Sequence, residues 1–339
     1  MSTRSAMRNA LATVIGDDQV RRLSAVERRW RRTLARRIEP PLAPRRRPPT
    51  RPATRTGLAE RPRSRPAGGT GRNPKARRQA TPKSTFPDPT RSRHELLAGL
   101  HAALAPRTYL EIGVSDGRSL AISSTRSIGV DPAFKVTAPI ACDLRLVRAT
   151  SDDFFALPDA IEHFGGTPVD LAFIDGLHLA EFAYRDFINV ERLCGPTSVI
   201  VLDDMLPRST AEAARVQCRG AWAGDVFKAV EVIRSRRSDL AVIPVNTRPT
   251  GVVVVIGVDP LSTALADCYD DVLPALTAGD PQTVPDHVLS RTGAADPAAL
   301  AASPVWAELR ALRDGAGGGP DRHAVAATIA GAGLGGFGD

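Results

Sequence analysis

Short apolar runs alternate with amphipathic stretches between residues 92 and 260, which is typical of a sheet layered with helices. The runs are apolar on both faces, and this favours parallel strands that are covered on both sides. They predict strands at Thr108–Ile112, Ser127–Val130, Arg145–Ala149, Val169–Ile174, Ser198–Leu202, Leu240–Val245 and Val252–Val258. The stretches between them predict helices at His94–Leu104, Ser119–Ser124, Asp153–Phe164, Ala180–Leu193 and Asp225–Arg236. The expected fold is α/β, with a doubly wound, mostly parallel sheet of seven strands.

The far end of this sheet has a different connection. A short turn, Asn246–Gly251, separates the last two predicted strands, so we expect them to pair as an antiparallel hairpin that closes the sheet. Beyond residue 260 the pattern weakens. Pro304–Arg313 predicts a short amphipathic helix, and the Gly- and Ala-rich residues 315–339 are expected to be loose.

The chain before residue 92 is of another kind. In residues 1–38, apolar side chains recur at every third or fourth position from Val20 to Ile38, with arginines on the other faces. This pattern predicts a basic amphipathic leader that suits a membrane surface, an acidic partner, its own domain or a second copy. Residues 39–91 are rich in Pro and Arg and have too few apolar side chains to offset chain entropy, so we expect a disordered linker. A globular domain at 92–260 and an extension at 261–339 complete the predicted organisation.

Charge separates these parts further. Residues 1–93 hold 25 Lys and Arg against 6 Asp and Glu, which leaves 20 against 31 in the acidic remainder. The basic part predicts weak contact with anionic surfaces but no specific nucleic-acid site, because aromatic side chains do not interleave the arginines of the linker. The sequence has no apolar run of membrane-spanning length and no paired spacing among its four cysteines. We therefore expect a cytoplasmic protein whose oligomeric state, monomer or homo-oligomer, stays open.

The stretch YLEIGVSDGRSL at 109–120 carries the first chemical signal. A strand runs through Glu111 into a loop from Gly113 to Gly117, and a second strand ends on Asp131. Glycines let backbone approach a ligand, a following helix start offers free N–H groups, and the acid can accept hydrogen bonds from ribose hydroxyls. The arrangement predicts a nucleoside-binding loop.

Four motifs extend this signal: EIGVSDG at 111–117, GVDP at 129–132, FIDGLH at 173–178 and VIVLDDM at 199–205. With them, residues 107–258 resemble the class I S-adenosylmethionine-dependent methyltransferases, which have a Rossmann-like sheet, and in particular the methyltransferase 24-type small-molecule O-methyltransferases. The resemblance implies cofactor contacts from Glu111, Gly113, Ser115, Gly117, Asp131, Ser151 and Asp152. Ser115 stands where the family often has glycine. Since the loop lacks the G-x-G-x-x-G spacing, a nicotinamide-dependent oxidoreductase is disfavoured.

Acidic residues end two neighbouring strands. Asp175 follows the fourth predicted strand, and Asp203 and Asp204 follow the fifth, so their side chains should converge at the carboxyl edge of the sheet. Converging carboxylates repel one another unless a cation or proton intervenes, and oxygen ligands suit Mg²⁺. The spacing is similar to that of metal-dependent catechol-type methyltransferases, although Asp204 replaces an amide. That resemblance gives His178 the role of removing a hydroxyl proton; helix capping or solvent contact is the alternative.

Trp222 lies in a Gly-flanked loop before Asp225, which is the expected N-cap of the next helix. The indole is placed either to wall a substrate pocket or to pack on the core. The leading hypothesis is an S-adenosylmethionine-dependent, Mg²⁺-assisted O-methyltransferase acting on a hydroxyl of a small metabolite, a sugar or secondary metabolite. The alternative is a noncatalytic methyltransferase-like protein that its basic leader tethers to membrane, nucleic acid or a protein partner.

Overall fold

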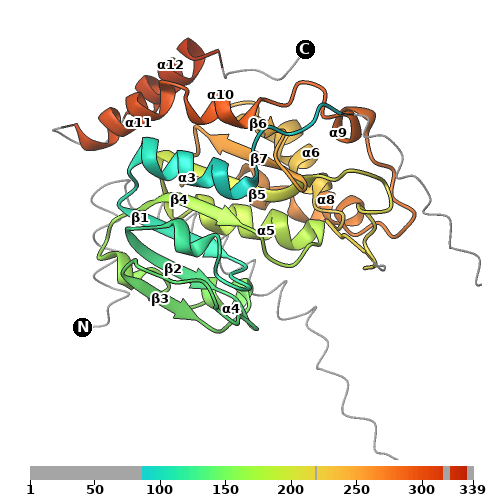
Figure 1. Ribbon diagram of the computed structural model, residues 1–339, viewed down its shortest axis with the longest axis horizontal. Coiled ribbons are helices and arrows are strands. Elements are labelled where there is room, and N and C mark those ends of the chain that lie inside the picture. Colours follow the sequence, from blue (N-terminus) through green and yellow to red (C-terminus); the bar gives the residue numbers. More distant parts are fainter. Residues whose placement is uncertain (1–85, 218–219, 316–320, 334–339) are drawn as a thin grey trace, which may run out of the picture. The chain divides into compact units, whose positions relative to one another are not determined.

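The computed structural model describes residues 86–217, 220–315 and 321–333 (Figure 1). The predicted leader and nearly all of the predicted linker lie outside the described residues. Within the described part, seven strands form one sheet in the order β3-β2-β1-β4-β5-β7-β6. The strands are β1 (Thr108–Ile112), β2 (Arg126–Val130), β3 (Leu144–Val147), β4 (Val169–Ile174), β5 (Cys194–Leu206), β6 (Ala241–Val245) and β7 (Gly251–Ile256).

In chain order, one described helix precedes β1 and the others lie between the strands or after the last strand (Figure 1). They are α3 (Arg93–Leu104), α4 (Ser151–Phe155), α5 (Ala180–Glu191), α6 (Phe227–Arg236), α7 (Ala264–Asp267), α8 (Tyr269–Leu276), α9 (Asp286–Ser290), α10 (Pro297–Ala301), α11 (Val305–Asp314) and α12 (Arg322–Gly331), with 3₁₀ turns η1 (Leu120–Ile122) and η2 (Glu162–Phe164). No helix of this described part is both long enough and apolar enough to cross a membrane.

Strand pairing confirms the predicted fold. Strands β1 to β5 pair in parallel, and β7 runs antiparallel to both β5 and β6. The short turn after β6 therefore makes the expected hairpin. Because β1, β2, β4 and β5 run in the same direction, their carboxyl ends meet at one edge of the sheet. That edge is where the predicted functional residues lie.

Alternating side chains of β1 show how the sheet is covered. Tyr109 faces α3, where its ring lies 4.8 Å from that of His101. Ile112 faces the opposite side, beside Gly176 and the carboxylate of Asp186 in α5. The α3 side holds the main apolar cluster, to which the fully buried Trp306 of α11 also belongs.

Two predicted helices are shorter than expected. The predicted helix at Ser119–Ser124 is reduced to the 3₁₀ turn η1. The predicted helix at Asp153–Phe164 is divided into α4 and η2, because Pro158 disfavours helical geometry in the residue before it. Thr150 caps α4 by accepting a hydrogen bond from the backbone of Asp153 at 3.1 Å.

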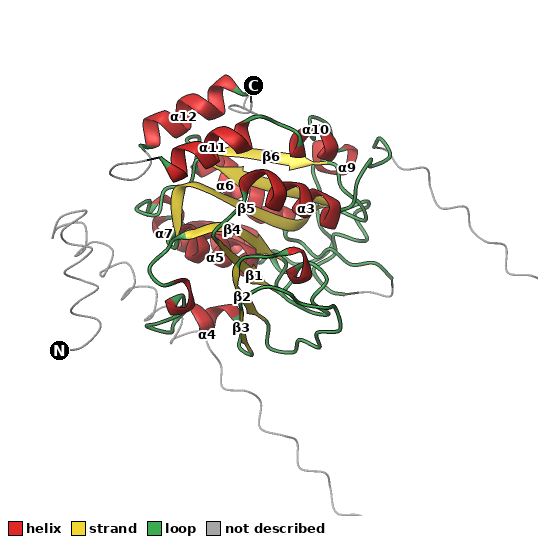
Figure 2. Ribbon diagram, turned by 60° about the vertical axis from the view of Figure 1, so that its left-hand side comes forward, coloured by secondary structure: helices red, strands yellow, loops and turns green. Residues whose placement is uncertain are grey.

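The chain after residue 260 shares the core of the sheet. α10 and α11 pack on α3 (Figure 2), and an added Cβ at Gly99 would lie 2.8 Å from the Cβ of Ala301. The expectation of a loose tail over 315–339 is wrong for α12, which Asp321 caps and which buries Val325 and Ile329. Their spacing of four residues puts both side chains on one face of a helix.

Candidate active site

The loop after β1 has a backbone that favours glycine at three positions. Gly113 has a φ of 89°, Ser115 of 49° and Gly117 of 83°. A Cβ at Gly113 would lie 1.7 Å from the carbonyl oxygen of Asp175, so a larger residue cannot occupy this position. The left-handed conformation of Ser115 explains why glycine is common there among the proteins that the chain resembles. We call residues 113–117 the donor loop.

Asp131 folds back onto the donor loop. Its Oδ2 accepts hydrogen bonds from the N–H groups of Val114 at 3.0 Å and Ser115 at 2.8 Å, and its Oδ1 accepts from Ala133 at 2.6 Å. The segment after Asp131 also lies on the loop, since the N–H of Lys135 donates to the carbonyl of Ser115 at 2.9 Å. Asp131 therefore shapes the loop, and its predicted contact with ribose stays a prediction.

Glu111 is buried below the loop. Its two carboxyl oxygens accept hydrogen bonds from the hydroxyls of Tyr109 at 2.7 Å and Ser119 at 2.8 Å. Burial raises the pKa of Glu111 to about 8, because the charged form loses hydration that two neutral hydroxyls do not replace. The side chain thus ties β1 to η1, and its predicted contact with the cofactor stays a prediction.

Ser151 and Asp152 begin α4 beside the end of β3 and face α5. Asp152 accepts hydrogen bonds from Arg185 Nε at 3.0 Å and Nη2 at 2.5 Å. Ser151 hydrogen-bonds Asp186, whose burial raises its pKa to about 7. Both predicted adenine contacts are therefore engaged with α5 in this structure, and their cofactor role stays a prediction.

Asp175, His178 and Asp204 meet beside the donor loop. His178 Nε2 lies 3.3 Å from Asp175 Oδ1, and its Nδ1 lies 3.3 Å from Asp204 Oδ2. One potential ligand atom from each residue lies within 4.8 Å of the other two. Asp204 also accepts a hydrogen bond from the hydroxyl of Thr250 at 2.5 Å. We call these three residues the acid–imidazole cluster.

Asp203 lies next to this cluster but faces a different partner. Arg93, the first residue of α3, places Nη1 against the Asp203 carboxylate and Nη2 3.8 Å from Asp175. Among the three predicted metal ligands, the structure brings Asp175 and Asp204 together with His178 and pairs Asp203 with Arg93. Sequence reasoning missed Arg93 because no local pattern links the start of a helix to an acid in a distant strand.

Burial and charge act together on the titratable groups here. Burial, with neighbouring carboxylates, raises the pKa values of Asp203 and Asp204 above the ordinary range. Burial alone would lower the pKa of His178, but its hydrogen bond to Asp175 and the charge of Asp204 outweigh that effect, so the pKa is raised. Both ring nitrogens face acceptors, which stabilises the imidazolium.

Trp222 packs on His178. The two rings stack with their centroids 5.0 Å apart, and the Trp222 carbonyl lies 3.3 Å from His178 Nδ1. Gly224 allows this approach, since a Cβ there would lie 1.8 Å from the carbonyl oxygen of His178. The expected capping role of Asp225 is wrong: its carboxylate accepts from the N–H of Ala180 at the start of α5, at 3.0 Å, instead of capping α6. The predicted role of Trp222 in a substrate pocket stays a prediction.

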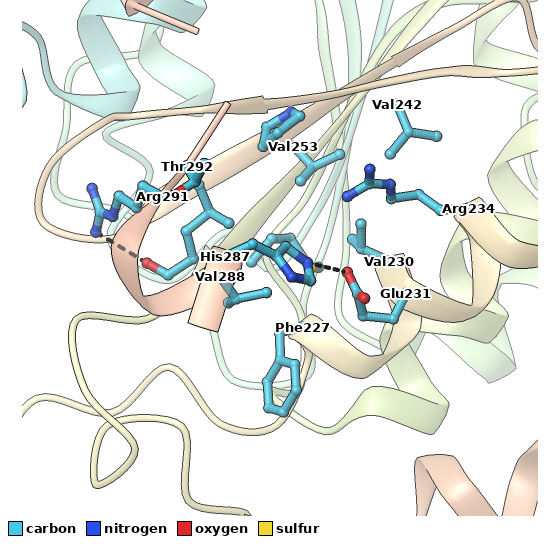
Figure 3. A pocket seen from close by; sticks show the side chains of 13 residues that line it. Phe227, Val230, Glu231, Arg234, Val242, Val253, His287, Val288, Arg291 and Thr292 are labelled. Carbon is cyan, nitrogen blue, oxygen red and sulfur yellow. Dashed lines mark hydrogen bonds and ion pairs between the residues drawn. The ribbon is translucent and has the colours of Figure 1, made fainter. Parts of the chain in front are cut away.

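A separate cavity of about 240 Å³ lies between α6, α9 and the sheet (Figure 3). Apolar side chains such as Val242 and Val253 line it, and His287 and Glu231 pair at its edge at 3.2 Å. No residue of the acid–imidazole cluster lines this cavity. The cavity is therefore distinct from the candidate active site.

Residues 110–205 match the sequence profile of a family described as a methyltransferase domain. This span contains the donor loop, Asp131, Asp175, His178, Asp203 and Asp204. The match assigns a methyltransferase domain to this part of the chain. The family match ends at residue 205, so Trp222 and Thr250 lie beyond it, and Arg93 precedes it.

Solved structures with a similar fold include one cofactor-bound protein and two O-methyltransferases. Cofactor-bound Rv0187 from MTB is 19% identical, with 51% of this chain and 83% of that chain covered and a TM-score of 0.37. The O-methyltransferase TomG from Streptomyces achromogenes, solved with SAM, is 18% identical, with 49% and 80% covered and a TM-score of 0.38. An O-methyltransferase from Bacillus cereus, solved with SAH, is 18% identical, with 48% and 80% covered and a TM-score of 0.36. Likenesses at this level carry no argument about acceptor or metal. No curated protein sequence matches the chain significantly.

Proposed function

We propose that this methyltransferase transfers the methyl group of S-adenosylmethionine to a hydroxyl of a small metabolite, a sugar or a secondary metabolite, with the assistance of Mg²⁺. The observation that carries the proposal is the junction at Asp175. The N–H of Asp175 donates a hydrogen bond to the carbonyl of Ile112 at 2.8 Å, its carbonyl oxygen lies against Gly113, and its carboxylate lies beside the His178 ring. A methyl donor on the donor loop would thus lie beside the group that prepares the acceptor.

His178 is the base in this proposal. In the neutral tautomer that carries its proton on Nδ1, the Nδ1–H group donates a hydrogen bond to the Trp222 carbonyl, and Nε2 is left to take the proton of the acceptor hydroxyl. Stacking on Trp222 holds the ring plane, and Asp175 stabilises the imidazolium that results. Positioning and proton removal are the tasks of the protein, because the methyl group passes directly from sulfur to oxygen.

The residues present fit a divalent cation. Asp175 and Asp204 offer carboxylate oxygens close enough to share one ion, and the pair would carry unbalanced negative charge whenever His178 is neutral. These two residues would hold Mg²⁺, and His178 Nε2 would stay available for the proton. A bound cation would lower the pKa of an acceptor hydroxyl.

Calorimetric titration with S-adenosylhomocysteine and NAD, side by side, tests the cofactor class. Only S-adenosylhomocysteine should bind the full-length protein. A screen of sugars and phenolic or aliphatic alcohols with labelled S-adenosylmethionine and Mg²⁺ then tests the acceptor class. Products that carry the labelled methyl group only on nitrogen or carbon, and none on oxygen, would overturn the proposed O-methylation.

Two substitutions test the residue roles. His178→Ala should retain binding of S-adenosylhomocysteine and lose methyl transfer by roughly 100-fold or more, the usual effect of removing a general base. Asp175→Asn should also retain that binding and lose transfer, because it removes a cation ligand and the charge that stabilises the imidazolium. His287→Asn is a matched control, because His287 also pairs with a carboxylate, at 3.2 Å, but lies at the separate cavity. Full transfer by both site variants would refute the assigned mechanism.

A further inference from the structure

Arg93 enters the candidate active site from outside the matched family span. Its side chain is 21% exposed, its Nη1 contacts the buried Asp203 carboxylate, and its Nη2 lies 3.8 Å from Asp175 Oδ2. No methyltransferase motif of the sequence includes this residue. Its guanidinium nevertheless lies among the same acids that attract a cation.

The start of α3 is fixed at the position that this contact needs. Ser92 Oγ accepts a hydrogen bond from the N–H of Glu95 at 3.2 Å, and Glu95 Oε2 accepts from the N–H of Ser92 at 2.7 Å. This reciprocal capping box makes Arg93 the first residue of the helix. Arg93 therefore projects from a defined helix end.

The segment before α3 is attached to the turn between β6 and β7. Arg248 in that turn donates to the carbonyl of Thr90 at 3.2 Å and to Glu95 at 2.9 Å, and Asn246 Nδ2 donates to the carbonyl of Pro87 at 2.9 Å. The next strand begins beside Thr250, whose hydroxyl holds Asp204. One structural unit thus positions both Arg93 and a partner of the acid–imidazole cluster.

Arg93 also changes which acids can bind a cation. The Asp203 carboxylate is buried and in direct contact with the Arg93 guanidinium, whose charge offsets that of the acid. Asp203 lies outside the group of ligand atoms within 4.8 Å of one another, and removal of Arg93 would free its carboxylate to turn toward that group as a third acidic ligand. With Arg93 in place, that ligand is occupied.

We propose that Arg93 is a positioning residue that keeps Asp203 from coordinating a cation and so restricts the cation, and with it the acceptor hydroxyl, to Asp175 and Asp204 beside His178. The inference rests on the proposed function for the presence of a cation. It goes beyond that function because it assigns different tasks to the neighbouring acids Asp203 and Asp204.

The test measures Mn²⁺ binding to the full-length protein by electron paramagnetic resonance, without acceptor or turnover. Arg93→Met should bind Mn²⁺ more tightly by about tenfold, because it removes a nearby positive charge and frees Asp203. Arg93→Lys should resemble the wild type. Arg91→Met is the matched control. Arg91 lies two residues before Arg93, its side chain is 54% exposed, and it contacts Glu95 instead of the acids of the site. This variant should leave the affinity for Mn²⁺ unchanged.

Asp203→Asn and Asp204→Asn separate the two acids. Asp204→Asn should weaken Mn²⁺ binding by about tenfold or more, whereas Asp203→Asn should change it by less than about threefold. Because Asp203→Asn leaves Arg93 without its partner, the double variant R93M/D203N provides a charge-balanced form, and it should bind Mn²⁺ as the wild type does. Loss of Mn²⁺ binding in both variants that lack Asp203 would overturn the inference.

The same data distinguish this inference from the proposed function. If the wild type binds no Mn²⁺ but Arg93→Met does, the cation role in the proposed function fails, while Arg93 is shown to block a site that includes Asp203. If neither protein binds Mn²⁺, the inference is overturned. Methyl transfer without added cation would test the proposed function on its own.

Discussion

The donor loop and the acid–imidazole cluster meet at Asp175, but different interactions hold them in shape. The donor loop is held by contacts with its backbone: the Asp131 carboxylate accepts from the N–H groups of Val114 and Ser115, and Gly113 lies against the Asp175 carbonyl. The cluster is held by charge, with His178 between two acids and Arg93 on a third. The groups that shape the loop lie within short sequence motifs, whereas the balance of charges also depends on Arg93, which lies outside them.

Substitutions at two glycines disturb the donor loop and the acid–imidazole cluster separately. Gly113→Ala should have the largest effect, because its Cβ would overlap the Asp175 carbonyl at a positive φ. We expect a loss of at least about 3 kcal/mol in the free energy of unfolding, together with loss of cofactor binding. Urea unfolding and titration with S-adenosylhomocysteine measure the two effects.

Gly166→Ala is the control for the strain of a positive φ. Gly166 has a φ of 84° and no atom within 4 Å of an added Cβ, so the substitution should cost about 1 kcal/mol and leave cofactor binding intact. Equal losses in the two variants would show that the contact between the donor loop and Asp175 contributes nothing beyond local strain.

Gly224→Ala disturbs the acid–imidazole cluster instead of the donor loop. Its Cβ would lie 1.8 Å from the His178 carbonyl, so the loop that carries Trp222 must move away from His178. Methyl transfer should fall by about 100-fold, as expected for a misplaced base, while the affinity for S-adenosylhomocysteine stays near that of the wild type. A parallel loss of cofactor affinity would contradict the separation of the two regions.

Glu111→Gln tests the buried carboxyl below the donor loop through the pH dependence of the free energy of unfolding. Folded Glu111 holds its proton up to a pKa of about 8, against 4.5 for an unperturbed side chain. The folded state therefore binds more protons than the unfolded state between these values, and the free energy of unfolding falls as pH rises through this window. The wild type should therefore lose about 3 kcal/mol relative to the variant between pH 6 and pH 9.

Urea unfolding at the two pH values measures this difference. Asp186, with a pKa of about 7, gives both proteins a slope of the same sign, and comparison of variant with wild type cancels it. An unchanged difference between pH 6 and pH 9 would mean that Glu111 is ionised in the folded protein.

Ser115→Gly should have the smallest effect. Ser115 has a φ of 49°, and glycine removes the cost of that conformation, so the variant should be stabilised by up to about 1 kcal/mol. Thermal unfolding and cofactor titration measure it. Destabilisation would indicate that the serine hydroxyl, not the backbone, holds the loop.

The sequence predicts the buried sheet well because each inner strand is a continuous apolar run. The observed β1 and β4 have the predicted bounds, Thr108–Ile112 and Val169–Ile174. Irregular connections are harder to predict, as the division of the predicted helix at Asp153–Phe164 shows. α12 was missed because Gly and Ala around Val325 and Ile329 conceal their helical spacing.

In the candidate site, too, residues in regular strand patterns are predictable and residues brought in by tertiary packing are not. Asp175, His178 and Asp204 are predicted because they lie at or just beyond the carboxyl ends of neighbouring strands, which must converge. Arg93 and Thr250 are not, because they reach the acids from a helix before β1 and from the turn before β7, and tertiary packing alone brings them there. Whether an acid faces a cation or an arginine is therefore decided by residues outside the motifs.

The most direct test of the account is a crystal structure with S-adenosylhomocysteine and Mn²⁺, with the metal located by its anomalous signal. We expect the cofactor on the donor loop with its sulfur facing His178, the metal between Asp175 and Asp204, and Arg93 still paired with Asp203. A cofactor bound away from the donor loop, or a metal on Asp203 with Arg93 displaced, would contradict the account.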